Sequence, residues 1–282
     1  MARHAPTERK MKLTFWKMHG LGNDFIVLDS RRTGYVPQPA VAARLCHRRF
    51  GIGADQVLIL LRSKKADYRM VILNADGGEV EMCGNGIRAL ALFLRRRRIS
   101  RKSRFRIETL AGIIVPEVIG KQVRVDMGEP IFEPSRIPVA LPEAPLNRPL
   151  EVDCNRFQVT AVSMGNPHCV IPVDQVDQVP LDQLGPKIEH HPWFPRRANV
   201  EFVQVLNRRH LKVRVWERGA GATLACGTGA CASLVALVKL GLAERKATVS
   251  LPGGDLQIEW AKSNRVLMTG PAEMVFQGSV EI

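Results

Sequence analysis

The sequence predicts an α+β protein of two pseudo-symmetric halves, each with mostly antiparallel strands wrapped around a central helix. Three observations support this fold class. Matched residues recur at one spacing, as in Cys83 and Cys226 (226 − 83 = 143). Short segments that alternate apolar and polar residues, typical of strands, occur in both halves. A Cys-Gly-x-Gly turn precedes a segment with helical apolar spacing in each half. A repeat of this length indicates two similarly built units.

Composition limits the class of protein. The chain has 282 residues with 45% hydrophobic content, enough to bury a substantial core. It has no apolar run of the roughly 18 to 20 residues that span a bilayer, and its start does not resemble a signal peptide. Six cysteines are scattered without CxxC pairs, which suggests neither a disulfide scaffold nor a zinc site. We expect a cytoplasmic globular protein without a membrane partner or a bound metal.

The formal net charge is +14, and part of it lies in "RRRRISRKSRFR", residues 95–106. A nucleic-acid partner is therefore one interpretation of this run. Nucleic-acid binders usually combine basic surface with stacking aromatics or a recognition motif, and the aromatic fraction here is 6%. Arginines also suit a helix C-terminus. We favour a solvated helix end and loop over nucleic-acid binding.

The elements follow in order along the chain. Residues 1–11 form a basic segment that we expect to be a flexible tail. Residues 12–130 form the first half, with strands predicted in "FIVLD", "DYRMVILN" and "VRVDM" and a helix after Cys83. Residues 131–272 form the second half, which begins with a proline-rich connector and continues with strands in "LKVRVWE" and "DLQIEW" and a helix after Cys226. The last segment, about 273–282, is expected to pack as a strand back onto the first half.

Each Cys-Gly-x-Gly turn places a thiol at a helix N-terminus, where free backbone N–H groups can bind a carboxylate. Such a position can lower a thiol pKa from about 8.5 to roughly 3.5–7.5. One copy alone is more simply an ordinary turn with a buried cysteine. Two copies in register favour a function, because two facing turns could hold one α-carbon between two sulfurs. One ionised and one protonated thiol would then invert that centre.

Polar residues recur in the same register. Gly22-Asn23 corresponds to Gly165-Asn166, Gln56 to Asn199, and Asn74 to Glu217. Each amide alone is more simply a satisfied structural group, because unpaired buried amides are costly. Taken as a set, these residues are candidate ligand-binding groups: Asn23, Gln56, Asn74, Asn166 and Asn199.

Six motifs in this order resemble the diaminopimelate epimerase family: "MHGLGNDFIVLD", "GADQ", "NADGGEVEMCGNGIRA", "GNPHCV", "NVEF" and "ERGAGATLACGTGACA". They run from Met18 to Ala232. The resemblance implies a small-molecule substrate, with LL- and meso-diaminopimelate interconverted in lysine and peptidoglycan precursor synthesis. It also implies that no cofactor, neither pyridoxal phosphate nor metal, takes part. A homodimer is left open.

The resemblance also implies residue roles. Cys83 would be the proton donor and Cys226 the acceptor in the LL-to-meso direction. His168 and Glu217 match positions that tune the two thiols, although His168 could equally be a satisfied core residue. The family's substrate-binding positions correspond to Asn23, Gln56, Asn74, Gly84, Asn85, Asn166, Asn199, Glu217, Arg218, Gly227 and Thr228.

Two alternatives remain at this point. Another two-cysteine racemase, acting on proline or hydroxyproline, would share the fold, but such enzymes usually carry a histidine where this chain has Asn85 and lack "GNDF" and "ERGAG". A binding protein that uses the cleft or the basic surface without chemistry would require neither thiol.

Overall fold

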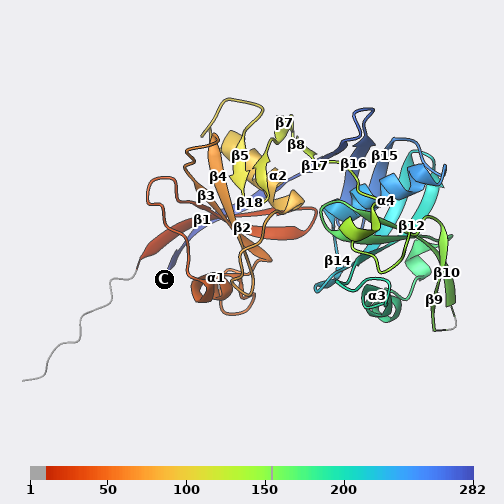
Figure 1. Cartoon of the computed structure of the whole chain (residues 1–282). Helices are drawn as coiled ribbons and strands as arrows, with labels where there is room; N and C mark the ends of the chain where they lie inside the picture. The colour runs from red at the N-terminus through yellow and green to blue at the C-terminus, as the bar shows by residue number, and fades with distance from the viewer. Residues whose placement is uncertain (1–10, 154) are drawn as a thin grey trace, which may run out of the picture.

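A computed structural model describes residues 11–153 and 155–282 and shows two lobes side by side, each built on a β-sheet (Figure 1). The first sheet has the strand order β18-β1-β2-β3-β4-β5-β6. Its strands are β1 (Lys12–Gly20), β2 (Asn23–Asp29), β3 (Gln56–Leu61), β4 (Tyr68–Asn74), β5 (Ile107–Thr109), β6 (Gly112–Ile114) and β18 (Glu273–Glu281).

The second sheet has the order β7-β8-β17-β16-β15-β13-β12-β11-β10-β9, with β14 paired to β13. Most pairings in both sheets are antiparallel. The strands are β7 (Glu117–Ile119), β8 (Gln122–Asp126), β9 (Arg148–Val152), β10 (Asn155–Ser163), β11 (Pro167–Pro172), β12 (Asn199–Asn207), β13 (His210–Glu217), β14 (Gly221–Thr223), β15 (Lys246–Leu251), β16 (Gly254–Trp260) and β17 (Val266–Pro271).

One long helix fills the middle of each lobe, as the sequence predicted. These helices are α2 (Gly84–Arg96) and α4 (Gly227–Lys239), and both are buried along most of their length. A helix that is buried on all sides is typical of a domain core. Two shorter helices, α1 (Pro39–Cys46) and α3 (Leu181–Glu189), were not anticipated, nor were the short 3₁₀ turns η1 (Pro134–Arg136) and η2 (Val176–Gln178).

Each sheet is buried on both faces, which explains its continuous apolar strands. In β2, Phe25 and Val27 pack with the central helices, whereas Ile26 and Leu28 pack on the opposite face with α1. Successive side chains of a strand point to opposite faces, so a strand covered on both sides reads as an unbroken apolar run. The inner faces of both sheets and both central helices share one core.

The repeat seen in the sequence is present in the structure, element by element. The bounds of α2 and α4 differ by 143 positions at both ends, and so do those of β1 and β10. The fold class is therefore confirmed as α+β with two pseudo-symmetric halves.

The lobes also exchange strands. The C-terminal strand β18 pairs with β1 in the first sheet, while β8, from the first half of the sequence, pairs with β17 in the second. Each of the proposed halves, residues 12–130 and 131–272, therefore forms a sheet that includes a strand from outside its own range. Residues 1–10 of the proposed tail lie outside the described residues, and Met11 pairs its backbone with Ile282.

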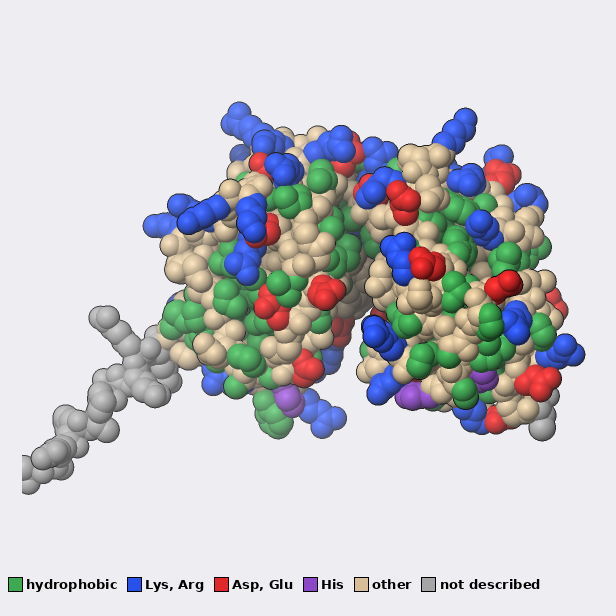
Figure 2. Space-filling model, in the orientation of Figure 1, with side chains coloured by type: hydrophobic (Ala, Val, Ile, Leu, Met, Phe, Trp, Pro, Cys, Tyr) green, Lys and Arg blue, Asp and Glu red, His purple; other side chains and the backbone are tan. Residues whose placement is uncertain are grey.

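The basic run lies at the surface. Arg95 to Arg98 are exposed at the end of α2, and Lys102 forms an ion pair with Asp67 at 2.8 Å. Lysine and arginine side chains are prominent over the upper part of the first lobe (Figure 2). In the part of the chain that the structure describes, no helix is long and apolar enough to cross a membrane.

Candidate active site

The two cysteines occupy equivalent positions at the starts of the central helices. Cys83 is the N-cap of α2, and its sulfur accepts a hydrogen bond from the N–H of Gly86 at 3.3 Å. Cys226 is the N-cap of α4, and its sulfur accepts from the N–H of Gly229, also at 3.3 Å. Both residues have extended backbone angles, so each helix begins directly after the thiol.

The structure brings the two turns together. The side-chain amide of Asn85, in the first turn, donates to the carbonyl of Ala225, in the second, at 3.1 Å. Both turns also pack on Met268: a Cβ on Gly84 would lie 3.1 Å from its methyl carbon, and one on Gly227 would lie 3.0 Å from its sulfur. A side chain at either position would press on Met268, so glycine suits this close approach. Figure 2 shows a groove between the two lobes on the face in view.

A small polar cluster surrounds Cys83. Asn23, at the start of β2, accepts at its Oδ1 from the amide of Asn85 at 3.2 Å and from the Cys83 thiol at 3.7 Å. The Nδ2 of Asn23 donates to Asp55 at 2.8 Å, which fixes which end of the amide faces the thiol. The contact with Asn23 favours the protonated form of Cys83, because only the thiol can donate.

Gln56 and Asn74 form a neighbouring pair at facing ends of β3 and β4. The Nε2 of Gln56 donates to the Oδ1 of Asn74 at 2.8 Å. Gln56 shares the inner face of β3 with Leu58, whose methyl group lies 3.2 Å from where a Cβ of Gly86 would be. Among the described residues, the buried oxygens Gln56 Oε1 and Asn85 Oδ1 lack a hydrogen-bond partner. Acceptors of this kind suit the ammonium group of a ligand.

A second cluster surrounds Cys226. The sulfur lies 3.5 Å from the hydroxyl of Thr228, to which the amide of Asn166 donates at 3.4 Å. Asn166 in turn contacts His168 Nε2 at 2.9 Å. The other ring nitrogen of His168 lies 2.7 Å from Glu201, and both side chains are fully buried. His168 therefore reaches the thiol through Asn166 and Thr228.

The remaining predicted residues lie where β12, β13 and β14 meet. Asn199 accepts from the backbone N–H of Arg218 at 3.0 Å and donates to the carbonyl of Pro167 at 2.9 Å. Glu217 accepts from the hydroxyl of Thr223 at 2.5 Å. The guanidinium of Arg218 is exposed and donates to the carbonyl of Arg196, so no contact of its side chain joins it to either turn in the described structure.

Burial dominates the ionisation of both thiols. Burial raises the pKa of Cys83 to about 11. The backbone N–H groups of Gly86 and Asn85 stabilise the thiolate and so act in the opposite direction, but their effect is smaller. Burial also raises the pKa of Cys226 well above its usual value, and the nearby carboxylates Glu217 and Glu201 add to this effect. A helix N-terminus favours the opposite direction, but here desolvation of each thiolate outweighs the hydrogen-bond donors around its sulfur.

Glu217 is shifted in the same sense. Burial raises its pKa, although hydrogen bonds with Thr223 and Cys226 favour the carboxylate. The carboxylate of Glu217 and the thiolate of Cys226 are like charges in a desolvated site, so the ionisation of one disfavours the ionisation of the other.

Sequence reasoning missed three polar residues of the site. Asp55 holds Asn23, Glu201 holds His168, and Arg88 is fully buried one turn into α2. Each lies inside a motif that the sequence analysis quoted, namely "GADQ", "NVEF" and "CGNGIRA". The signal that could have found them is a charged residue inside an otherwise apolar or glycine-rich stretch, where burial requires a partner.

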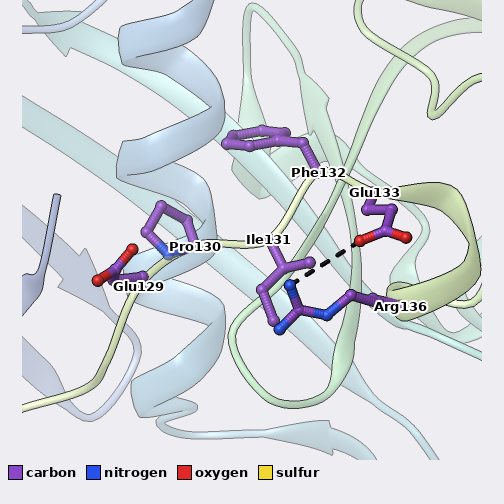
Figure 3. Close-up of a pocket in the computed structure, with 6 residues that line it drawn as sticks. All are labelled: Glu129, Pro130, Ile131, Phe132, Glu133 and Arg136. Carbon is purple, nitrogen blue, oxygen red and sulfur yellow. Dashed lines mark ion pairs between the residues drawn. The ribbon is translucent and has the colours of Figure 1, made fainter.

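A separate surface pocket lies in the connector and is lined by Glu129, Pro130, Ile131, Phe132, Glu133 and Arg136 (Figure 3). Lys239, the last residue of α4, lies 4.9 Å from the ring of Phe132. Because α4 is roughly 20 Å long and Cys226 precedes its first residue, this pocket is at the far end of the helix from the thiol. It does not belong to the cysteine site.

The arrangement can support acid–base chemistry at a carbon next to a carboxylate. Two helix N-termini supply N–H groups for the carboxylate, and each supplies one thiol beside it. Thiols with raised pKa values are weak acids, and once ionised they are strong bases.

Comparisons with known proteins point to one family. The family model described as "Diaminopimelate epimerase" matches residues 15–133 and 160–275. A diaminopimelate epimerase of Carboxydothermus hydrogenoformans is 53% identical over 270 residues, covering 94% of this chain and 98% of the relative. One of Moorella thermoacetica is 54% identical over 273 residues, covering 94% and 98%.

Solved structures with low identity share the fold alone. A Bacillus anthracis phenazine biosynthesis protein of the PhzF family has a TM-score of 0.71 at 16% identity, covering 96% of this chain and all of that one. A probable proline racemase from Agrobacterium radiobacter has a TM-score of 0.68 at 16% identity, covering 95% and 92%. At these identities the likeness to a racemase carries no argument about the substrate.

Proposed function

The chain belongs to the diaminopimelate epimerase family, and from this premise we propose that Cys83 and Cys226 interconvert LL-2,6-diaminopimelate and meso-2,6-diaminopimelate by moving a proton at one α-carbon. The protein is an isomerase, and the family match does not favour a proline or hydroxyproline racemase. The observation that supports the two-thiol assignment is the contact between the two turns, made by the hydrogen bond from Asn85 to Ala225.

The proton transfer balances without an added reactant. In the LL-to-meso direction, the ionised sulfur of Cys226 takes the α-proton and becomes a thiol. Cys83 gives its proton to the opposite face of the carbon and becomes a thiolate. The negative charge that develops on the substrate spreads into its α-carboxylate, where N–H groups of the two turns can stabilise it. The reverse reaction uses the same two groups with their roles exchanged.

Cys83 is suited to the donor role. Its thiol donates to Asn23 Oδ1, an interaction that holds the sulfur protonated before turnover. On the other side, Glu217 and His168 adjust the proton affinity of Cys226, Glu217 directly and His168 through Asn166 and Thr228.

Recognition of the substrate divides between its two ends. The turn residues Gly84, Asn85, Gly227 and Thr228 bind the reacting carboxylate. Neighbouring polar residues read the remaining amino and carboxylate groups: Asn23, Gln56, Asn74, Asn166, Asn199, Glu217 and Arg218. The buried Oε1 of Gln56 has no hydrogen-bond partner among the described residues and can accept from a substrate ammonium group, which supports this division.

The test is α-hydrogen exchange and inversion measured together in deuterated water, with LL-diaminopimelate as substrate and L-proline as control. Cys83→Ala keeps the base that faces the LL proton, so we expect exchange with retained configuration and no inversion. Cys226→Ala should show neither from the LL isomer. Full inversion by either variant contradicts the two-thiol mechanism, and equal turnover of proline contradicts the substrate.

We further propose that the enzyme acts in the cytoplasm as a homodimer. Val275 and Phe276 are about half exposed on β18, which is the edge strand of the first sheet among the described residues, and exposed apolar side chains on an edge strand favour association. Sedimentation of the wild type beside Val275→Glu tests this proposal. A wild-type monomer at micromolar concentration contradicts it.

A further inference from the structure

Arg88 is a buried cation that the proposed reaction does not yet use. Its side chain has no exposed surface, although it lies only five residues after Cys83. Among the described residues, it forms no ion pair with a carboxylate, and its Nη2 has no hydrogen-bond partner. Burying a guanidinium without a counter-charge is costly, so its position calls for a compensating role.

The guanidinium points back to the turn that carries Cys83. Nη1 donates to the carbonyl of Gly84 at 3.2 Å, and Nε donates to the carbonyl of Pro271 at 3.3 Å. Long side chains on a helix lean toward its N-terminus, which carries the charge from position 88 toward the first turn. A Cβ on Gly20 would lie 3.2 Å from Nη2, and one on Gly270 would lie 3.3 Å from Nε. Glycines on both sides therefore leave room for the group.

The second half carries no such charge. The 143-residue offset places Arg88 opposite Cys231, a buried thiol whose pKa burial raises to about 12. The charged groups near Cys226 are the carboxylates Glu217 and Glu201. Near Cys83 they are Glu217, at the end of β13, and Arg88 on its own helix. Arg88 therefore gives the Cys83 turn a buried positive charge that has no counterpart at the matching position of the Cys226 turn.

We propose that Arg88 is a positioning residue for the two-thiol reaction, a fixed positive charge behind the Cys83 turn that stabilises the ionised sulfur of Cys83. Burial raises the pKa of this thiol, and the field of Arg88 opposes that rise. The same burial lowers the pKa of Arg88 to about 10, which leaves it charged at neutral pH. Its contribution to turnover rests on the proposed function, whereas its effect on the sulfur does not.

The experiment measures alkylation of Cys83 by iodoacetamide as a function of pH, in the full chain without substrate, with peptide mass spectrometry to assign the modified cysteine. Cys83 is partly accessible, whereas Cys226 is 5% exposed, so the two can be separated. Arg88→Met removes the charge while keeping an apolar chain of similar length. Arg88→Lys keeps the charge. The matched control is Arg96→Met, which removes the same charge from the exposed end of the same helix.

We expect Arg88→Met to alkylate Cys83 about tenfold more slowly below the thiol pKa, since one pKa unit changes the thiolate fraction tenfold. Arg88→Lys should retain most of the wild-type rate, and Arg96→Met all of it. With meso-diaminopimelate as substrate, Cys83 is the base, and the acid limb of kcat/KM should move to higher pH in Arg88→Met alone.

Three results would overturn the proposal. The first is an alkylation rate in Arg88→Met within twofold of the wild type. The second is a loss in Arg88→Lys as large as in Arg88→Met, which would assign the effect to shape. The third is that Arg88→Met fails to fold while Arg88→Lys folds with a slowed Cys83, because the residue would then serve structure alone. If alkylation responds as expected but the wild type does not epimerise diaminopimelate, the proposed function fails and the electrostatic role of Arg88 remains.

Discussion

The side-chain amide of Asn85 lies 3.1 Å from the carbonyl of Ala225 and 3.2 Å from Asn23 Oδ1, so one NH₂ group joins the two cysteine turns and the start of β2. Both of its protons are used, and its own oxygen faces no partner among the described residues. The contact links the parts of the chain that the proposed reaction needs to hold in register.

Asn85→Asp should lower kcat/KM about 100-fold, because a buried carboxylate cannot donate to two acceptors and leaves both unpaired. Steady-state kinetics with LL-diaminopimelate measures this loss. Asn207→Asp makes the same chemical change at an exposed position and should leave activity unaltered. Activity of Asn85→Asp within threefold of the wild type would show that the bridge is dispensable.

Asp55→Asn should reduce kcat about tenfold, because Asp55 sets the orientation of the Asn23 side chain beside Cys83. Asp55 accepts from Asn23 Nδ2 at 2.8 Å and thereby keeps Oδ1 of that amide toward Cys83. An amide at position 55 no longer selects that orientation, at a cost of about 1 kcal/mol for one misplaced hydrogen bond. Asp255→Asn, on an exposed carboxylate, is the control. The interpretation fails if kcat is unchanged and only thermal stability falls.

Gly229→Ala should be more damaging than Gly86→Ala, although the two glycines are equivalent in the repeat. A Cβ at 229 would lie 2.7 Å from the buried carboxylate of Glu201, whereas one at 86 would lie 3.2 Å from a methyl group of Leu58. Overpacking against a fixed charged group should cost about 1–3 kcal/mol of the free energy of unfolding. Urea unfolding of both variants compares the two costs, and an equal loss would contradict the argument.

Lowering the pH should reduce the free energy of unfolding more in the wild type than in Asp24→Asn. Burial alone raises the pKa of Asp24, but hydrogen bonds from Arg48 and Lys17 outweigh it and lower the pKa to about 2. A carboxylate with a depressed folded-state pKa contributes stability above its unfolded pKa of about 3.9, and this contribution is lost as the pH falls through the folded value. The lost contribution is about 2 kcal/mol for this shift.

The measurement for Asp24 is urea unfolding at several pH values between about 5 and 2. We expect the stability difference between the wild type and Asp24→Asn to be constant above that window and to shrink within it. Asp182→Asn, at an exposed helix residue, is measured in parallel as the control. A difference that stays constant down to the lowest pH would exclude the linkage.

The central helices and the paired strands could be predicted because their signals are local. Alternation in "DYRMVILN" and the glycines after Cys83 depend only on neighbouring residues, and β4 and α2 form there. Helices α1 and α3 were missed because each is short and lies on the outer face of a sheet that the sequence does not show to be covered. The exchange of β8 and β18 between the sheets is a long-range pairing, for which sequence pattern supplies no partner.

The candidate site shows the same division. The two cysteine turns and the amides of Asn23, Gln56, Asn74, Asn166 and Asn199 were predicted from spacing, because the repeat marks their positions twice, whereas Asn85, Thr228 and Arg218 came from the family resemblance. Three charged residues have no counterpart at the 143-residue offset: Asp55, Glu201 and Arg88. They act through contacts with residues in other parts of the chain, so the spacing of the repeat could not identify them.

The sequence by itself determined the two-fold design, the helix-capping thiols and the family, since each depends on residues at fixed offsets along the chain. Tertiary structure alone decided the ionisation of those thiols. The helix N-terminus favours a thiolate, but packing against two sheets removes the water that would solvate it, and the pKa of Cys83 rises instead of falling. Desolvation is a property of everything that surrounds an atom, so it follows from the folded core and not from the residues beside Cys83.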